Sequence, residues 1–193
     1  MCIAPHSCFN LLNRGIWRSS ISFLTKVQLY RTYIKPVLLY GSETWARTRA
    51  LLDKVDAFDN ICLRRILRIP YVDHVANATV WLRAGSPPQL SQLIQKSRLR
   101  LFGHVARMNA LLDISRALKT SIRGLSTEWK RPPGRPRHTW LRTLGSDLQP
   151  HNLGLNLAWK YAQDREHWKH LVETATLQFG ACAWWWWWYG RCT

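Results

Sequence analysis

Residues 47–67 read RTRALLDKVDAFDNICLRRIL, and the spacing of their apolar side chains decides the fold class. The apolar positions recur at intervals of four, three, four and four residues, which places them on one face of a helix. They are Leu51, Val55, Phe58, Cys62 and Ile66. Pro70 ends the helix, and Arg64, Arg65 and Arg68 add positive charge where the helix dipole favours it.

A helix is also predicted on the N-terminal side, over residues 22–40. Its apolar residues are three or four apart: Val27, Tyr30, Ile34 and Leu38. Ser22 or Thr25 can cap its start, and Gly41 offers a stop. Pro36 is expected to kink this helix or to end its first part.

Further helices follow on the C-terminal side. A short one is predicted over residues 77–83, and Ser86 with Pro87 and Pro88 should open a long one. Two shorter helices are expected over residues 139–148 and 156–174. Their apolar anchors are Trp140, Leu144, Leu148, Trp159, Trp168, Leu171 and Val172. Because no stretch alternates with a period of two, the fold should be mainly α: a small helical bundle, a basic linker and short C-terminal helices.

The charge points to a polyanionic partner. Lys and Arg number 28 against 11 Asp and Glu, which gives a net charge of +17. Such a surface favours nucleic acid over a membrane, because no apolar run is long enough to span a bilayer. Residues 1–17 do not resemble a signal peptide, so we expect an intracellular protein of the nucleus or cytoplasm, with no membrane partner.

No motif for catalysis, a cofactor or a metal is found. The five cysteines form no C-x-x-C pair, and Cys62 lies on the apolar stripe, where a small core residue is expected. No two acidic residues are adjacent, although two-metal catalysis needs converging carboxylates. We therefore expect that this chain alone is not an enzyme and has no cofactor.

Arginine dominates residues 74–146, which hold only Asp113 and Glu128 as acids. The basic residues there are Arg83, Lys96, Arg98, Arg100, Arg107, Arg116, Lys119, Arg123, Lys130, Arg131, Arg135, Arg137 and Arg142. A planar guanidinium suits phosphate, so this region is expected to bind a nucleic-acid backbone with little sequence preference. Within it, residues 134–137 read GRPR, which is close to the core of an AT-hook that enters the minor groove of DNA.

Read in order, several segments resemble the C-terminal region of LINE-type (non-LTR) retrotransposon endonuclease–reverse transcriptases. Residues 34–45, IKPVLLYGSETW, look like the entry to the polymerase thumb, and residues 62–67, CLRRIL, resemble the next thumb helix. Residues 103–108, GHVARM, fit the Gly-His-Val-x-Arg-Met signature of that family. GRPR at 134–137 and Asp164–Arg165 with Trp168 resemble the downstream elements. The paired aspartates of the palm are not in this sequence.

The resemblance implies a division of the chain. Residues 1–16 would be a truncated lead-in from the palm side, and 17–108 a helical thumb-like domain. Residues 109–138 would be a basic linker containing Pro and Gly, 139–176 a short helical segment, and 177–193 a tryptophan-rich tail that includes Trp184–Trp188.

The resemblance also implies roles for the basic residues, because a polymerase thumb grips the primer–template duplex. Six are expected to contact phosphate: Arg64, Arg65, Lys96, Arg98, Arg100 and Arg107. Four would hold RNA or DNA through the linker: Lys130, Arg131, Arg135 and Arg137. Residues 43–45 should brace the bundle, and the polymerase palm would be a further partner. Two alternatives stay open: a domesticated DNA-binding protein of the AT-hook type, and a non-functional translated remnant of the transposon.

Overall fold

A computed structural model describes residues 7, 9–46, 48–124, 134 and 139–174 of the chain. The structure is mainly helical, and no strand occurs in the part of the chain that it describes, which confirms the predicted fold class. The chain forms two compact units. Unit 1 comprises Met1–Gly41 and Arg49–Ser91, and unit 2 comprises Ser42–Thr48 and Gln92–Thr193.

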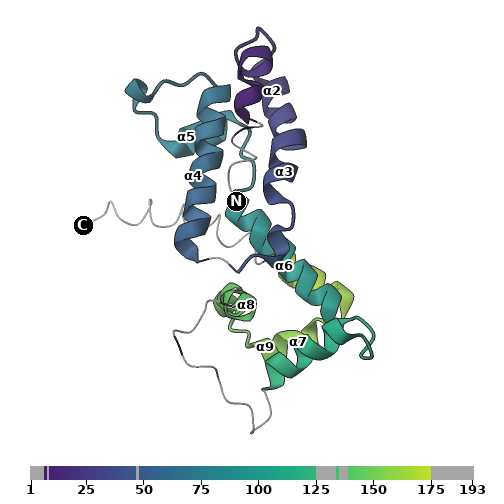
Figure 1. Cartoon of the computed structure of the whole chain (residues 1–193). Helices are drawn as coiled ribbons and strands as arrows, with labels where there is room; N and C mark the ends of the chain where they lie inside the picture. Colours follow the sequence, from purple (N-terminus) through teal and green to yellow (C-terminus); the bar gives the residue numbers. More distant parts are fainter. Residues whose placement is uncertain (1–6, 8, 47, 125–133, 135–138, 175–193) are drawn as a thin grey trace, which may run out of the picture. The chain divides into compact units, whose positions relative to one another are not determined.

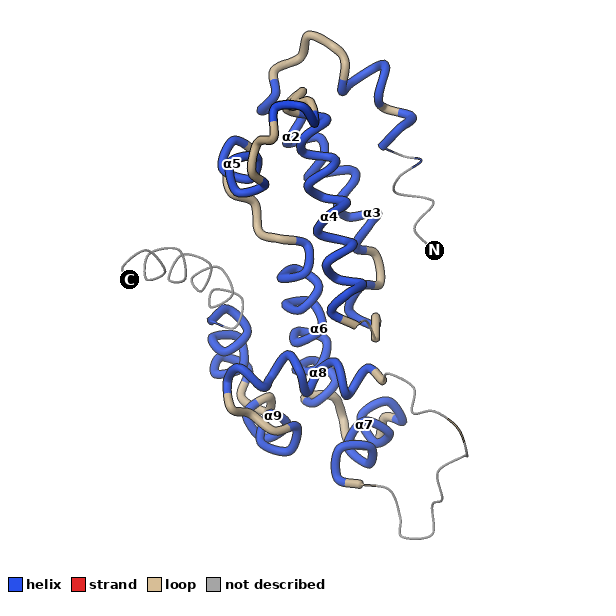
Figure 2. The backbone as a smooth tube through the Cα atoms, turned by 90° about the vertical axis from the view of Figure 1, so that its left-hand side faces the viewer, coloured by secondary structure: helices blue, strands red, loops and turns tan. Residues whose placement is uncertain are grey.

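Unit 1 is built on an antiparallel pair of helical columns (Figure 1). The first column consists of α2 (Phe23–Leu29), a π-helical segment (Tyr30–Ile34) and α3 (Lys35–Leu39). The second is α4 (Arg49–Ile66), which lies beside the first column in both backbone views (Figures 1 and 2). The short helix α5 (Asn77–Arg83) packs against α4.

The local signals of the first column act largely as predicted. The Ser22 hydroxyl accepts a hydrogen bond from the Thr25 N–H at 3.2 Å and caps α2, and Gly41 has a φ of 66° just beyond α3. Pro36 lies in the first turn of α3, directly after the π-helical segment. A wider turn before a proline accommodates its ring and its missing N–H, so the column continues where we expected a kink or an end.

The core of unit 1 includes the N-terminal residues. Phe9 and Trp17 are each 1% exposed, and their rings stack with centroids 4.9 Å apart. They pack with residues from the two columns and α5, among them Tyr30, Cys62 and Val80. Phe9 lies in the segment predicted as a truncated lead-in over residues 1–16, and it is part of this core.

A buried polar group lies at the centre of this core. The Tyr30 hydroxyl donates to Asp59 Oδ1 at 2.6 Å, and Lys35 Nζ lies 3.4 Å from Asp59 Oδ2. Cys62 is 1% exposed, and burial is the main reason that its pKa rises to about 12. The expectation that Cys62 is a core residue is confirmed, and its thiol stays protonated at neutral pH.

Unit 2 forms around α6 (Leu90–Ala106), whose first residues belong to unit 1. The other helices are α7 (Asp113–Arg123), α8 (Trp140–Leu148), α9 (Leu155–Tyr161) and a stretch over residues 165–174. All seven predicted apolar anchors of the C-terminal region lie in its core or pack against it. Two single-turn 3-10 helices, Ser42–Thr44 and Gln149–His151, complete this unit.

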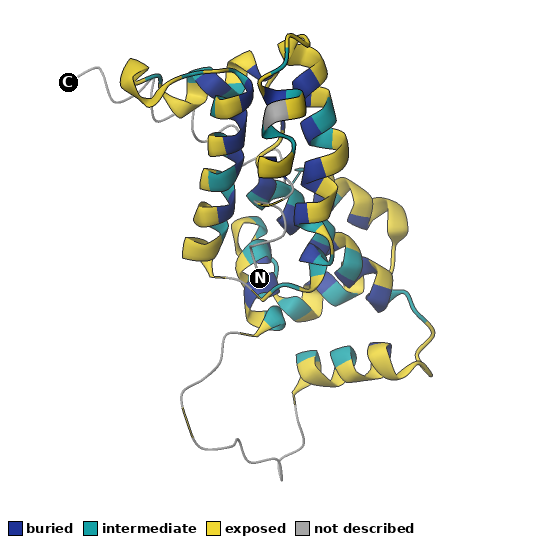
Figure 3. Cartoon of the chain, turned by 45° about the horizontal axis from the view of Figure 1, so that its top comes forward, coloured by how far each residue is buried: buried dark blue, intermediate teal, exposed yellow. Residues whose placement is uncertain are grey.

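Three boundaries differ from the predictions. Helix α6 begins at Leu90 instead of after Ser86, because Asp56 Oδ1 accepts the Ser91 N–H at 2.9 Å and caps that end. Helix α7 occupies part of the predicted linker, although most of its surface is exposed (Figure 3). The predicted helix over 156–174 is broken at Asp164, whose side chain accepts the N–H groups of Glu166 and His167.

Candidate nucleic-acid interface

The residues that form a basic hollow in unit 1 come from two parts of the chain. The segment before α2 contributes Asn10, Asn13, Trp17 and Arg18, and the C-terminal end of α4 and the turn after it contribute Arg65 and Arg68. We call this hollow the arginine cleft. Its volume is about 580 Å³. Pockets of that size accommodate a small-molecule ligand or a nucleotide.

Among the residues that the structure describes, no carboxylate lines the arginine cleft. The sequence explains this, because there is no acidic residue in residues 1–42 or in residues 60–72, which together supply the whole lining. A solvated surface normally mixes both signs of charge. The guanidinium groups of Arg18, Arg65 and Arg68 therefore face the cleft without an acidic neighbour in its wall.

Hydrogen bonds hold the wall of the cleft in place. Arg68 has a φ of 54°, and its Nη2 donates to the carbonyl oxygens of Arg18 and Ser19 at 2.8 and 2.9 Å. Lys26 is buried, and its Nζ donates to the carbonyl oxygens of Trp17 and Ser19 at 3.1 and 2.7 Å. Two cations thus fix the turn at residues 17–19 that presents Arg18.

The pKa of the Lys26 ammonium reflects its burial and the positive charge around the cleft. Burial lowers its pKa, and the positive charge of Arg68 lowers it further. The two groups repel each other because both carry a positive charge. An anion bound in the cleft would weaken this repulsion.

Arg64 and Arg65 were both predicted to contact phosphate, and the structure places them differently. Arg65 is exposed, lines the cleft and donates from Nη1 to Asn10 Oδ1 at 2.9 Å. Arg64 is half-buried and donates from Nη2 to the Val75 carbonyl oxygen and Asn77 Oδ1, which fixes the segment before α5. Only Arg65 of this pair belongs to the cleft.

The structure corrects the prediction for Arg98. This side chain is fully buried in unit 2, where Nε lies 2.6 Å from Asp147 Oδ2 and Nη1 donates to the Trp45 carbonyl oxygen at 3.0 Å. A guanidinium with no exposed surface cannot reach a nucleic-acid backbone. Its role is structural, and the carbonyl at Trp45 fits the expected bracing role of residues 43–45.

The other predicted residues on α6 and at its end form a basic stripe. Lys96 and Arg100 are four residues apart and so lie on one side of the helix, and Arg107 follows directly after its last residue. Arg100 is exposed, Lys96 and Arg107 are half-buried, and Arg107 Nη1 donates to the Ala162 carbonyl oxygen at 2.8 Å. Lys130, Arg131, Arg135 and Arg137 lie outside the described residues.

Arg18 and Arg68 were missing from the predicted site. Arg68 carried a signal in the sequence, because it follows Arg64 and Arg65 in the same basic stretch, in the turn after α4. Arg18 carried no such signal, since the cleft joins it to residues almost fifty positions away in the sequence.

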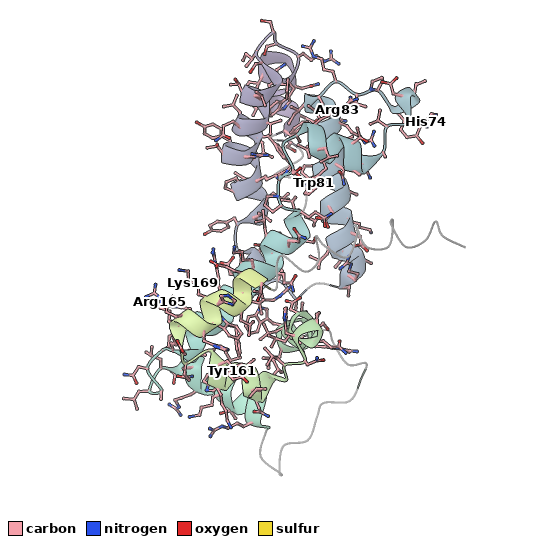
Figure 4. All side chains as sticks on the ribbon, turned by 180° about the vertical axis from the view of Figure 1, so that it is seen from behind. His74, Trp81, Arg83, Tyr161, Arg165 and Lys169 are labelled. Carbon is pink, nitrogen blue, oxygen red and sulfur yellow. The ribbon has the colours of Figure 1, made fainter. Side chains whose placement is uncertain are left out.

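A second basic surface in unit 2 has a different character. Figure 4 shows Arg165 and Lys169 projecting to the same side of the helical stretch over residues 165–174. The same stretch and its cap also carry exposed carboxylates, Asp164, Glu166 and Glu173. Mixed charge makes this surface a weaker candidate for a polyanion than the arginine cleft.

The described residues also bear on metal binding and on membranes. They contain no cluster of His, Cys, Asp and Glu side chains that could hold a metal ion. Within the same residues, no helix is both long enough and apolar enough to cross a membrane.

No protein-family model, no curated protein and no solved structure matches this chain. From its fold and its cleft, the chain is a mainly helical protein with a candidate anion-binding site.

Proposed function

We propose that the chain is the thumb and downstream region of a LINE-type reverse transcriptase, and that it binds the phosphate backbone of nucleic acid. The ordered motifs of the sequence support the origin, and the net charge of +17 supports the binding. The observation that carries the proposal is the arginine cleft, whose described lining includes three arginines and no carboxylate. The stripe of Lys96, Arg100 and Arg107 provides a second set of contacts.

Such binding is electrostatic and has little sequence preference. Each phosphate that a basic side chain neutralises releases counterions, so affinity falls steeply as salt rises. We propose no catalytic role for this chain. Its proposed role is to bind and hold a duplex or a template strand.

The test is a titration of duplex and single-stranded nucleic acid at several salt concentrations. The variant R18Q/R65Q/R68Q removes the charges of the cleft. It should lower the slope of log affinity against log salt by up to about two to three units if all three side chains contact phosphate. The matched variant R49Q/K54Q/R83Q removes three exposed charges elsewhere on unit 1 and should have a smaller effect.

Absence of binding at low salt would refute the proposal. If the two triple variants have equal effects, the proposal that the chain binds nucleic acid stands, but the cleft is not the binding site. A preference for A·T-rich over mixed duplex would instead favour the AT-hook alternative at residues 134–137.

A further inference from the structure

The arginine cleft is a hollow of limited volume, and its size bears on what it can bind. The cleft concentrates its positive charge in about 580 Å³, within the size range of small-ligand pockets. A strand end or a single nucleotide fits such a hollow better than the middle of a duplex.

The donors of the cleft exceed what an internal phosphodiester needs. Arg18 makes no side-chain hydrogen bond within the described part of the chain, and Arg65 uses only Nη1 on a neutral acceptor. Arg68 uses only Nη2, again on neutral carbonyl oxygens. Because a guanidinium carries several N–H donors, each of the three keeps donors for a ligand.

We propose that the arginine cleft holds the terminal phosphate of a nucleotide, such as the 5′-phosphate of a strand, in preference to an internal phosphodiester. This inference rests on the proposed function in taking nucleic acid as the ligand. A terminal phosphate carries a charge of about −1.5 to −2 at neutral pH and three strong acceptor oxygens. An internal phosphodiester carries a single negative charge, so three uncompensated guanidinium groups favour the terminal group.

The neutral lining completes the match to a nucleotide. The Asn13 amide can donate to and accept from a sugar or a base, whereas Asn10 Oδ1 accepts from Arg65 Nη1. Trp17 is a fixed wall, because its ring stacks on Phe9 and its Nε1 donates to the Phe9 carbonyl oxygen at 2.8 Å. The positions of these groups are set before a ligand arrives, which lowers the cost of binding.

The experiment compares two strands of one sequence, one ending in a 5′-phosphate and one in a 5′-hydroxyl. Each carries a fluorophore at its 3′ end and is titrated with the full chain. We expect the phosphorylated strand to bind about tenfold more tightly, the ratio that one additional charge-assisted contact provides. R18Q should reduce this ratio to nearly one without loss of folding, because the side chain is exposed.

The control is K54Q, which removes one exposed positive charge from α4 outside the cleft. It should leave the ratio between the two strands unchanged. Equal affinity of the wild-type chain for the two strands would overturn the inference and leave the proposed function standing. A ratio that K54Q and R18Q lower equally would also overturn it, because net charge would then explain the preference.

A second measurement separates the two proposals if neither strand binds. Adenosine 5′-monophosphate is observed by ³¹P NMR, and the wild-type chain should broaden its signal more than R18Q does. Equal spectra with the two proteins would overturn the inference. Inorganic phosphate is the third probe, and we expect it to compete more weakly than the nucleotide. Equal competition by inorganic phosphate would overturn the role assigned to Asn13 and would restrict the ligand to a phosphate group.

Discussion

Gly103 of α6 lies directly against Trp168 of the helical stretch over residues 165–174. A Cβ atom at this position would lie 2.2 Å from Trp168 Nε1 and 2.3 Å from Trp168 Cδ1. The indole is 2% exposed, and its Nε1 donates to the Leu99 carbonyl oxygen at 2.9 Å. The rigid ring therefore has little room to move.

We predict that G103A lowers the free energy of unfolding by about 2 kcal/mol, the scale of an overpacked core. Chemical denaturation followed by tryptophan fluorescence measures this. The control is G145A in α8, where an added Cβ would meet nothing within 4 Å. That change should leave stability the same or raise it slightly, because alanine is the better helix former. A neutral G103A would contradict the close approach.

Asp147 gives a pH-dependent prediction. Burial raises the pKa of its carboxyl, and the positive charge of Arg98 lowers it only in part. Removing that charge with R98M should therefore raise the pKa further. We expect a loss of about 3 kcal/mol at neutral pH, because a buried carboxylate is left unpaired.

The sign of the pH dependence follows from the direction of the shift. A carboxyl whose pKa is higher in the folded than in the unfolded chain destabilises the fold above that pKa. The penalty disappears as the pH falls and the group takes up its proton. Denaturation curves of R98M should thus approach those of the wild type in mildly acidic buffer. The double variant R98M/D147N has no carboxyl there and should not show this recovery.

The prediction for Arg98 failed at the scale of one residue, although the sequence held a usable signal. Arg98 is four residues from both Ile94 and Phe102, which are buried on the core side of α6. Its charge suggested a surface position, but its helical spacing matched the core. Asp147, which makes burial possible, is 49 residues away, and helical periodicity gives no information about such a pair.

At the scale of the element, the start of α6 depends on a side chain from another helix. Asp56 of α4 accepts the Ser91 N–H, one of the groups that a helix leaves unpaired in its first turn. We predict that D56A lowers stability by about 1 kcal/mol and that D56N retains most of it, because both carboxylate and amide oxygens cap a helix.

The control for this cap is D53A in the same helix. Asp53 pairs with Arg49 at the surface, where their side chains are 58% and 74% exposed. Exposed pairs contribute about 0 to 1 kcal/mol, so D53A should have the smaller effect. Hydrogen exchange at the first residues of α6 locates the change. Equal protection in D56A and the wild type would contradict the capping role.

Elements were predicted well where the signal was local. Helix α4 follows its apolar spacing, and the Ser22 cap and the Gly41 stop need only neighbouring residues. The start of α6 and the break at Asp164 were missed for different reasons. The first depends on a long-range cap from Asp56. The break at Asp164 is a local cap, but the apolar spacing continues on both sides of it and therefore predicted one unbroken helix.

At the scale of the whole molecule, the N-terminal residues decide whether unit 1 has a complete core. We predict that F9A lowers the free energy of unfolding by about 3 kcal/mol, the scale of a large core truncation. Phe9 is buried against Trp17 and Tyr30. The control L11A changes a side chain that is 81% exposed and should be nearly neutral. Thermal unfolding of both variants checks this.

The same unfolding curves bear on the alternative of a non-functional remnant. Two buried clusters predict cooperative melting, whereas a chain without a core would lose its helices gradually. The division into two units was not predictable from local patterns. It depends on residues 42–48 joining a unit that is otherwise formed by residues 92–193.

That division has a consequence for the order of events on the ribosome. The carbonyl oxygen of Glu43 accepts a hydrogen bond from Trp140 Nε1, a residue made 97 positions later. At ordinary rates of synthesis the delay is about 5 to 20 s, which is long compared with helix formation. Every core residue of unit 1 has been synthesised before then. The first unit can therefore fold before the second, which completes its contact with residues 42–48 only after Trp140 has been synthesised.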